Sequence, residues 1–324
     1  MLLLNEQQMR EVASCDLLIE GIEEALKIFR NGDCQMAKRY SVEFGENCML
    51  YMPCIAGGYI GSKISAEFPE NPHKYGLPHI NAVALLNDAS NGQLVAIMNG
   101  SALTALRTGA AGGMAMKYLA RKNSHTVGVI GCGVQGLNQL MFACNVRQIR
   151  TAYLYDKSKI DFDAFTEKIN KLIYPKSIEI VVCKDVKELL RNSEIVIMAT
   201  TSREPVLPND PELLRGKSYF AFGSWKPYMR ETPDAIWDVV KNVYIESPHA
   251  AQESGDLTQP TEKGILSMDR IKMIDELFTG GKTDEELGET RLFKSVGISV
   301  YDVITAKRIY ERAVSLGIGT EYRF

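Results

Sequence analysis

The chain has 324 residues, of which 45% are hydrophobic, so it can build a sizeable core and divide into two domains. Its formal net charge of −3, without a concentrated basic face, argues against nucleic-acid binding. Its apolar runs are shorter than the roughly 18 residues of a membrane helix, and the first residues lack a signal peptide's basic flank and cleavage site, so we expect a cytoplasmic protein without a membrane partner.

The first 120 residues predict an amphipathic helix followed by short strands. The helix is expected at residues 16–31, DLLIEGIEEALKIFRN, where apolar side chains recur at helical spacing. The strand-like segments are residues 49–56, 59–66, 79–87 and 94–99. Turn signals separate them at Gly57-Gly58, Asn87-Asp88 and Asn91-Gly92, which predicts hairpins in an antiparallel or mixed sheet. Residues 100–121 predict a helix with a glycine-rich interruption.

From residue 126 onward, strands alternate with helices. The predicted strands are residues 126–131, 151–156, 178–183, 194–200, 217–223 and 242–246. The predicted helices are residues 134–146, 161–173 and 185–191. Such alternation is typical of a parallel sheet covered by helices on both faces. Residues 299–316 again have helical periodicity, and we expect this tail to pack on the N-terminal part.

These patterns predict an α/β fold in two domains. Residues 121–299 are expected to form a doubly wound parallel sheet of Rossmann type. Residues 1–120 and 300–324 are expected to form an α+β domain into which that sheet is inserted.

A glycine pattern lies where the first predicted strand of the α/β domain meets its helix. Gly131 and Gly133 would allow a tight turn and a close approach of the backbone to a pyrophosphate. Gly136 would let the helix pack closely on the strand, and the helix N-terminus would face the phosphates. The alternative is a plain turn of an α/β fold without a ligand.

An acidic residue stands where the same fold needs one. Asp156 closes the next predicted strand, 25 positions after Gly131, where a carboxylate grips the ribose 2′-OH. Its charge favours NAD, although the adjacent Lys157 and Lys159 leave NADP possible. Further along, residues 200–202 (TTS) follow a predicted strand and are expected to line the same crevice. Otherwise they are loop hydroxyls that cap the next turn.

Three cations of the first domain lie in apolar surroundings: Arg39, Lys63 and Arg107. A charge in an apolar stretch is costly unless it meets a partner. Together the three could hold the carboxylate of a small acid, because arginine offers a fork and lysine a point charge. The alternative is that each pairs with an internal acid such as Glu67 or faces solvent.

Cysteine and histidine usage points to neither disulfides nor a metal. The seven cysteines are odd in number and none has CxxC spacing, so a reducing compartment fits best. The four histidines are scattered and form no HxxxH or Cys/His cluster. We therefore expect no bound metal.

Several stretches together resemble the ornithine cyclodeaminase/mu-crystallin family of NAD(P)-dependent enzymes. They are GSKISAEFPEN, LVAIMNG, LTALRTGAAGG, GVIGCGVQG, IVIMATTSREPVL, FGSWKPYMRETP, AAQESGDL and FKSVGISVYDVITA. They follow the family's order through nearly the whole chain. The resemblance implies a homodimer whose substrate-binding and dimerisation domain carries an inserted Rossmann domain. It also implies hydride transfer between a nicotinamide and the α-carbon of an amino acid or its imine.

The resemblance also implies roles for individual residues. Arg39, Lys63 and Arg107 match the group that holds the substrate carboxylate, with Lys63 and Arg107 as the catalytic pair and Lys63 placed near the reacting nitrogen. The expected cofactor-binding residues are Thr108, Gly131, Gly133, Val134, Gln135, Gly136, Asp156, Thr200, Thr201, Ser202, Gly223 and Lys294. Ser295, beside Lys294, matches a position near the nicotinamide end.

One departure from the family pattern bears on the substrate. Ornithine cyclodeaminases carry an aspartate in a GDxP pattern, whereas this chain has Gly223-Ser224-Trp225-Lys226-Pro227, with Trp225 at the aspartate's place when the prolines are aligned. Neither Trp225 nor Ser224 can replace a carboxylate as a base or as a partner for an ammonium group. A tryptophan wall suits an uncharged, ring-shaped substrate better. The alternative is that Trp225 only packs at a strand end.

The sequence therefore predicts an NAD(P)-dependent reductase of a small cyclic imino acid. The substrate type is Δ1-pyrroline-2-carboxylate or Δ1-piperideine-2-carboxylate, which would give proline or pipecolate. The alternatives are an ornithine or related cyclodeaminase, and an amino-acid dehydrogenase of alanine or opine type. A protein that binds a cofactor or small ligand without turnover, as a crystallin would, is the non-enzyme alternative.

Overall fold

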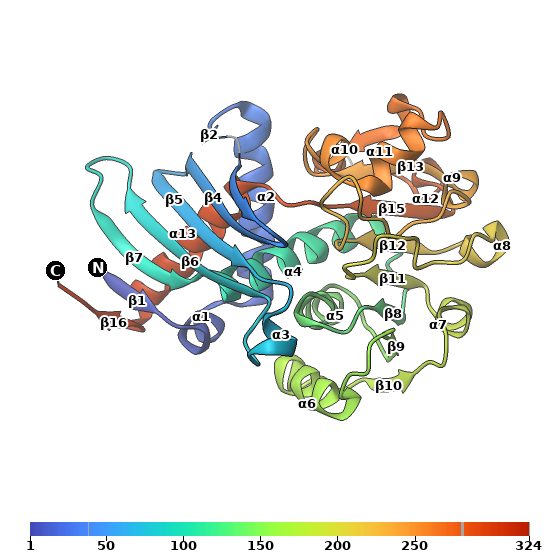
Figure 1. Cartoon of the computed structure of the whole chain (residues 1–324), viewed down its shortest axis with the longest axis horizontal. Helices are drawn as coiled ribbons and strands as arrows, with labels where there is room; N and C mark the ends of the chain where they lie inside the picture. Colours follow the sequence, from blue (N-terminus) through green and yellow to red (C-terminus); the bar gives the residue numbers. More distant parts are fainter. Residues whose placement is uncertain (38, 280–281, 324) are drawn as a thin grey trace. The chain divides into compact units, whose positions relative to one another are not determined.

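The computed structural model describes residues 1–37, 39–279 and 282–323 and divides the chain into two compact units (Figure 1). The first unit combines Met1–Ala110 with Ile298–Phe324, and the second is Ala111–Gly297. Helix α4 (Gly100–Leu119) contains the boundary between them. Within the described ranges, no helix is long and apolar enough to cross a membrane.

The first unit is built on a mixed sheet with the strand order β16-β1-β7-β6-β5-β4-β2, and β3 also pairs with β4. Its strands are β1 (Leu2–Leu4), β2 (Gln35–Met36), β3 (Tyr40–Phe44), β4 (Asn47–Ala56), β5 (Tyr59–Glu67), β6 (Ile80–Asp88), β7 (Leu94–Asn99) and β16 (Thr320–Glu321). The predicted hairpins are confirmed, since β4 to β7 pair antiparallel in succession. Gly57 and Gly58 both have positive φ, which the tight β4–β5 turn requires.

Helices cover one face of this sheet. They are α1 (Glu6–Val12), α2 (Cys15–Asn31) and α13 (Ser299–Leu316): α13 packs on β4 and β5, α1 packs on α13 and β7, and α2 packs on α13. The short helix α3 (Asn71–Lys74) connects β5 to β6. The predicted helices at both ends of the chain are therefore confirmed. Gly61 on β5 allows the close approach, because a Cβ there would lie 2.5 Å from Val303 Cγ2 on α13.

The second unit has a parallel sheet with the strand order β10-β9-β8-β11-β12-β15-β13-β14. Its strands are β8 (Thr126–Ile130), β9 (Thr151–Tyr155), β10 (Glu179–Val182), β11 (Ile195–Met198), β12 (Ser218–Ala221), β13 (Val240–Ile245), β14 (Ile271–Met273) and β15 (Thr290–Lys294). Its first part, β10-β9-β8-β11-β12, reproduces the 3-2-1-4-5 order of a doubly wound dinucleotide-binding sheet. The predicted fold class is confirmed.

Helices lie on both faces of this sheet, with α5 and α6 on one side and α7 to α9 on the other (Figure 1). The helices of the unit are α5 (Val134–Val146), α6 (Phe162–Ile173), α7 (Val186–Asn192), α8 (Pro211–Leu214), α9 (Ile236–Val239), α10 (Ala250–Glu253), α11 (Gly255–Glu262) and α12 (Asp284–Leu287), with 3-10 turns at Met268–Arg270 and Ile274–Leu277. Because both faces are covered, β11 and β12 are buried at every position.

One prediction about a helix was wrong, and several strands were not foreseen. The glycine-rich stretch does not interrupt α4, which runs unbroken from Gly100 to Leu119. Its glycines serve packing instead: a Cβ on Gly112 would lie 1.7 Å from Gln139 Oε1 and 2.9 Å from Phe222 Cζ. The strands that the sequence analysis did not foresee are β1, β2, β3, β14, β15 and β16. Of these, β15 lies between β12 and β13 in the interior of the second sheet.

Candidate functional site

The glycine turn lies between the end of β8 and the start of α5. Gly131 has φ +91°, and a Cβ there would lie 2.6 Å from Ala199 O. A Cβ on Gly136 would lie 2.1 Å from Gly131 O. Around Gly133, by contrast, no described atom would come within 4 Å of a Cβ. The first and third glycines are therefore required by packing, whereas the second leaves open space beside the backbone.

The start of α5 offers hydrogen-bond donors to that space. Gly133 is the N-cap, and within the described chain no side chain caps the helix. Val134, the first helical residue, is 65% exposed. Gln135 Oε1 is buried and accepts no hydrogen bond from any described group. Free backbone donors beside an open backbone fit a dinucleotide pyrophosphate, which accepts hydrogen bonds. The Gln135 acceptor does not add to this fit, because a pyrophosphate has no hydrogen-bond donor.

Asp156 is fixed beside the turn. Its Oδ2 accepts a hydrogen bond from Cys132 N at 2.8 Å, and its Oδ1 accepts one from Ser158 N at 2.8 Å. Gly131 N donates to Tyr155 O, which ties the end of β9 to the same turn. The structure thus brings Asp156 to the glycine turn, as the Rossmann arrangement requires.

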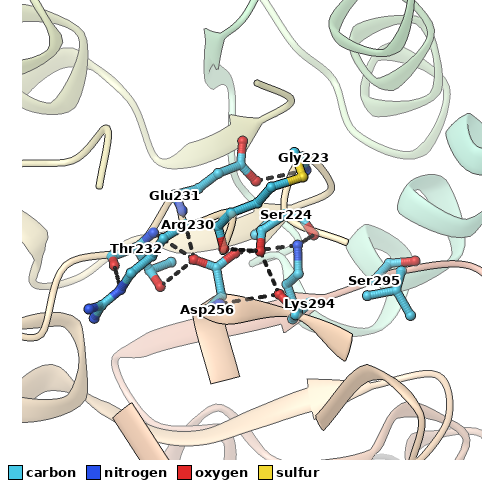
Figure 2. A network of polar contacts seen from close by, with 12 residues as sticks. Gly223, Ser224, Arg230, Glu231, Thr232, Asp256, Lys294 and Ser295 are labelled. Atoms are coloured by element: carbon cyan, nitrogen blue, oxygen red, sulfur yellow. Dashed lines mark hydrogen bonds and ion pairs between the residues drawn. The ribbon is translucent and has the colours of Figure 1, made fainter. Parts of the chain in front are cut away.

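A buried polar network joins the loops that follow β11 and β12 (Figure 2). Glu231 Oε1 accepts hydrogen bonds from Thr200 N at 2.7 Å and Thr200 Oγ1 at 2.9 Å, and its Oε2 accepts one from Gly223 N at 2.7 Å. Burial raises the pKa of Glu231, and the charge of Asp256 adds to this rise while Lys294 opposes it. The Thr200 hydroxyl therefore donates to Glu231. Thr201 is exposed, and Ser202 Oγ donates to Glu204 O.

Asp256 and Lys294 continue the network. Asp256 Oδ1 accepts hydrogen bonds from Glu231 N, Thr232 N and Thr232 Oγ1, each at 2.8 Å. Its Oδ2 forms an ion pair with Lys294 Nζ at 3.3 Å. Lys294 is fully buried at the end of β15, and its Nζ also donates to Ala221 O at 3.4 Å. The predicted residues Lys294 and Gly223 thus belong to one network. Two acids that the sequence analysis did not single out, Asp256 and Glu231, connect them.

The predicted cations of the first unit meet around a buried acid. Lys63 on β5 donates to Asp302 Oδ1 on α13 at 2.8 Å, and Arg107 Nε on α4 lies 3.2 Å from the same oxygen. Lys63 is 3% and Asp302 6% exposed. The internal acid is therefore Asp302, whereas Glu67, the acid first considered, accepts a hydrogen bond from Cys48 Sγ.

This cluster carries a surplus of positive charge. Among the described residues, Lys63 and Arg107 bring two cations to the one acid that both pair with, Asp302, and Arg39 lies near enough to influence both Lys63 and Asp302. Burial lowers the pKa of Lys63 to about 8; Asp302 opposes this drop, while Arg107 and Arg39 add to it. Burial alone raises the pKa of Asp302, but the charges of Lys63 and Arg107 outweigh it and lower the pKa overall. A buried surplus of positive charge fits an anionic ligand such as a carboxylate.

Two predicted site residues have different surroundings. Thr108 is buried on α4, directly after Arg107. Trp225 is half-buried in the loop after β12, and the Lys226 ammonium lies 4.5 Å from its ring centroid. Lys226 Nζ also lies 5.8 Å from the ring centroid of Tyr228. The loop after β12 therefore presents an aromatic ring with the Lys226 ammonium close to it.

The sequence analysis missed Glu231, Asp256 and Asp302 as members of these clusters. Asp302 carried a readable signal, because it interrupts the apolar run VYDVITA on one side of a predicted helix. Glu231 lies in a loop and Asp256 in the first turn of α11, and at both kinds of position an acid looks like an ordinary solvated or capping residue. In the part of the chain that the structure describes, no group of three or more His, Cys, Asp or Glu side chains is placed to hold a metal ion.

Comparison with known proteins identifies close relatives. The model of the ornithine cyclodeaminase/mu-crystallin family matches residues 1–317. A Δ(1)-pyrroline-2-carboxylate reductase of Bacillus cereus is 34% identical over 337 aligned residues, which cover 100% of both chains. The structure of Thermococcus litoralis Δ(1)-pyrroline-2-carboxylate reductase in complex with NADH and L-proline is 36% identical with a TM-score of 0.90, covering 99% of this chain and 100% of that one. An archaeal alanine dehydrogenase dimer with bound NAD is 30% identical with a TM-score of 0.87, covering 100% and 99%.

Proposed function

The chain belongs to the ornithine cyclodeaminase/mu-crystallin family, and from this premise we propose that it is an NAD(P)H-dependent reductase of a small cyclic imino acid. Δ1-pyrroline-2-carboxylate is the substrate that we favour, with Δ1-piperideine-2-carboxylate as its six-membered counterpart. The observation that carries this proposal is the full-length likeness to the Thermococcus litoralis reductase, whose structure holds NADH and L-proline. The products would be proline and pipecolate.

The cofactor is a nicotinamide dinucleotide, and we propose that the second unit holds it. When bound, it supplies the hydride that reduces the imine carbon. The open space at Gly133 and the uncapped start of α5 would receive the pyrophosphate, and Asp156 would bind the ribose. The Asp156 carboxylate favours NAD, because it would repel a 2′-phosphate.

We assign the substrate carboxylate to the cations of the first unit. Lys63 and Arg107 are already held together by Asp302, and the surplus charge of the cluster would be neutralised by the substrate's carboxylate. Lys63 Nζ would also polarise the imine nitrogen, which gains a proton as the carbon gains the hydride. Because these groups are fixed by burial and ion pairs, they would act mainly by positioning and electrostatics.

We further propose a division of labour and an assembly. The first unit would be the substrate-binding and dimerisation domain, and the second the Rossmann domain. The face of the first sheet that α13 does not cover carries exposed apolar side chains, among them Tyr40, Val42 and Phe44 on β3. The archaeal alanine dehydrogenase neighbour is a dimer, which supports pairing of two copies here. The seven free thiols fit the reducing conditions of the cytoplasm.

Alanine dehydrogenase activity is the second candidate. The archaeal enzyme is 30% identical over the whole chain, and the carboxylate-binding cations would serve alanine as well as a cyclic imine. An ornithine cyclodeaminase has less support. The Ser224-Trp225 pair, where the cyclodeaminase pattern would have its aspartate, offers no carboxylate that could pair with the ammonium of an ornithine side chain.

The proposal is tested with three substrate sets. These are Δ1-pyrroline-2-carboxylate with NADH or NADPH, pyruvate and ammonium with NADH, and L-ornithine with NAD. The first two are followed by the absorbance of the reduced nicotinamide, and the third, whose cycle regenerates NAD, by assay of proline and ammonia. We expect fast oxidation of NADH in the first set alone. Faster turnover of pyruvate and ammonium would favour the alanine dehydrogenase, and proline with ammonia from ornithine would show that Trp225 does not exclude diamino acids.

A variant separates an enzyme from a binding protein. Lys63→Met should abolish turnover of the imine and leave NADH binding intact, since Lys63 belongs to the carboxylate-binding cluster of the first unit. A chain that binds NADH and turns over none of the three substrate sets would instead be a binding protein or an enzyme of another imino acid.

A further inference from the structure

Glu231 is a fully buried acid whose two carboxylate oxygens are both occupied by the ends of neighbouring strands. One oxygen binds the backbone N–H and the hydroxyl of Thr200, which follows β11, and the other binds the N–H of Gly223, which follows β12. Gly223 is required for this contact, because a Cβ there would lie 2.4 Å from Glu231 Oε1 and 2.0 Å from Thr200 O. Glu231 therefore fixes the spacing of two backbone segments at the carboxyl edge of the sheet.

The segment at Thr200 packs against the glycine turn between β8 and α5. A Cβ on Gly131 would lie 2.6 Å from Ala199 O and 3.0 Å from Thr200 Cγ2, so residues 199 and 200 pack directly on the turn. Ala199 N also donates to Ile130 O. A shift of Thr200 would therefore reach the turn that receives the pyrophosphate.

Glu231 is itself held in place. Asp256 Oδ1 accepts the N–H of Glu231, and Lys294 faces the other oxygen of Asp256 (Figure 2). Arg230 N donates to Ser202 O and Val206 N donates to Glu231 O, which ties the Glu231 loop to the loop after β11 a second time. The carboxylate thus has little freedom to follow a displaced Thr200.

We propose that Glu231 is a positioning residue for the cofactor: its carboxylate pre-forms the wall of the dinucleotide crevice by clamping Thr200 and Gly223. This inference rests on the proposed function, because it assigns the crevice to a nicotinamide dinucleotide. Glu231 acts through the two clamped segments and needs no contact of its own with the cofactor.

The hydrogen-bond pattern makes Glu231→Gln a sharp test. All three partners donate, and the two backbone N–H groups point to different carboxylate oxygens. A glutamine has one acceptor oxygen, so in either orientation its NH2 would face a backbone N–H. One end of the clamp must therefore open, although the side chain keeps its shape. A buried N–H left without a partner is costly enough to predict roughly tenfold weaker binding of NADH.

Glu194→Gln is the matched control. Glu194 Oε2 accepts the N–H of His125, the N–H of Thr126 and the Thr126 hydroxyl, at the opposite edge of the same sheet. Here one oxygen takes all three hydrogen bonds, so a glutamine can keep them. NADH binding is measured by the fluorescence of the bound nicotinamide, together with Tm and with KM and kcat for the imine.

We expect Glu231→Gln to raise the Kd and KM for NADH more than it lowers kcat, while Glu194→Gln binds like the wild type. Equal NADH affinity in folded Glu231→Gln and wild type would overturn the positioning role and leave the proposed function standing. Failure of the wild type to bind NADH or NADPH would instead remove both.

If Glu231→Gln does not fold, hydrogen exchange on the wild-type chain still tests whether Glu231 pre-forms the crevice wall. The amides of Thr200 and Gly223 should be protected without any cofactor, because the clamp is already made. Protection that appears only after NADH is added would show that the wall is not pre-formed, which contradicts the proposal.

Discussion

The charge state of Lys63 links the structure to a pH dependence. Its pKa is lowered to about 8, so Lys63 is cationic below this pH and neutral above it. The neutral amine cannot attract the substrate carboxylate. We therefore predict that kcat/KM for the imine falls tenfold per pH unit above about pH 8, because kcat/KM reports the free enzyme. A pH–rate profile at saturating NADH measures this.

The same titration acts on stability in the opposite direction. An unfolded lysine keeps its proton to about pH 10.4, so just above pH 8 the unfolded state binds more protons and the Lys63 contribution to stability rises with pH. Loss of activity would then not be caused by unfolding. The arginine of Lys63→Arg stays charged across this range, so its pH–rate profile should not fall above pH 8. If kcat/KM of Lys63→Arg still falls above pH 8, the titrating group is not Lys63.

At the scale of single residues, the sequence could predict that Lys63 and Arg107 need a partner, because an unpaired charge among apolar residues is costly. It could not predict that the partner is Asp302, which lies 239 positions after Lys63 and meets it only when α13 packs on the sheet. Glu231 escaped for a similar reason. Two of its three donors are backbone N–H groups, which exist at every position and leave no mark in the sequence.

At the scale of the elements, two glycines of the β8–α5 turn allow an effect on protein stability to be separated from an effect on NADH binding. Gly133→Ala places a Cβ where no described atom lies within 4 Å, so we predict an unchanged Tm and loss of NADH affinity as the methyl enters the pyrophosphate space. Gly136→Ala places a Cβ 2.1 Å from Gly131 O, a backbone atom that cannot move aside. It should lower stability by about 1–3 kcal/mol. Thermal unfolding and NADH fluorescence titration of both variants measure the two effects.

The two substitutions control for each other, since each adds one methyl group to the same turn. Gly133→Ala with wild-type affinity for NADH would show that the open space is not the pyrophosphate site. Gly136→Ala with an unchanged Tm would mean that α5 can move away from β8.

The predictions for β15 and α4 were wrong for identifiable reasons. Strand β15 contains Arg291 and Lys294, and charged residues in a short segment do not look like a central strand. Both are buried, but Arg291 pairs with Asp284 and Lys294 with Asp256, so their charges are compensated by the tertiary structure. Helix α4 shows the converse, because Gly112 looks like a helix breaker and is retained for close packing on Gln139.

At the scale of the whole molecule, the chain builds its two units from three segments. The alternation of strands and helices in the second half was visible in the sequence and fixes the parallel sheet. The return of the chain to the first unit was expected from the helical periodicity of residues 299–316 and from the family resemblance. The structure anchors that return at Glu246, whose Oε1 accepts hydrogen bonds from Val296 N, Gly297 N and Ser295 Oγ.

The uncovered face of the first sheet leads to a prediction about assembly. Tyr40, Val42 and Phe44 alternate along β3 and so share one face, and Tyr40 pairs across the strands with Tyr51. All four are at least 37% exposed. An exposed apolar patch on a sheet favours association, and a second copy offers the same patch across a two-fold axis. We predict that Val42→Glu weakens the dimer at least tenfold, because the charge would be buried between two copies.

Sedimentation velocity over a concentration series measures the dimer, with Val314→Glu as the control. Val314 is 56% exposed on α13, the helix that covers the opposite face of the sheet, so the same substitution there should leave the assembly unchanged. The imine reductase rate of the dissociated Val42→Glu chain then shows whether one copy suffices for catalysis. A Val42→Glu chain that dimerises like the wild type would move the interface away from β3, and a wild type that stays monomeric would remove the dimer proposal altogether.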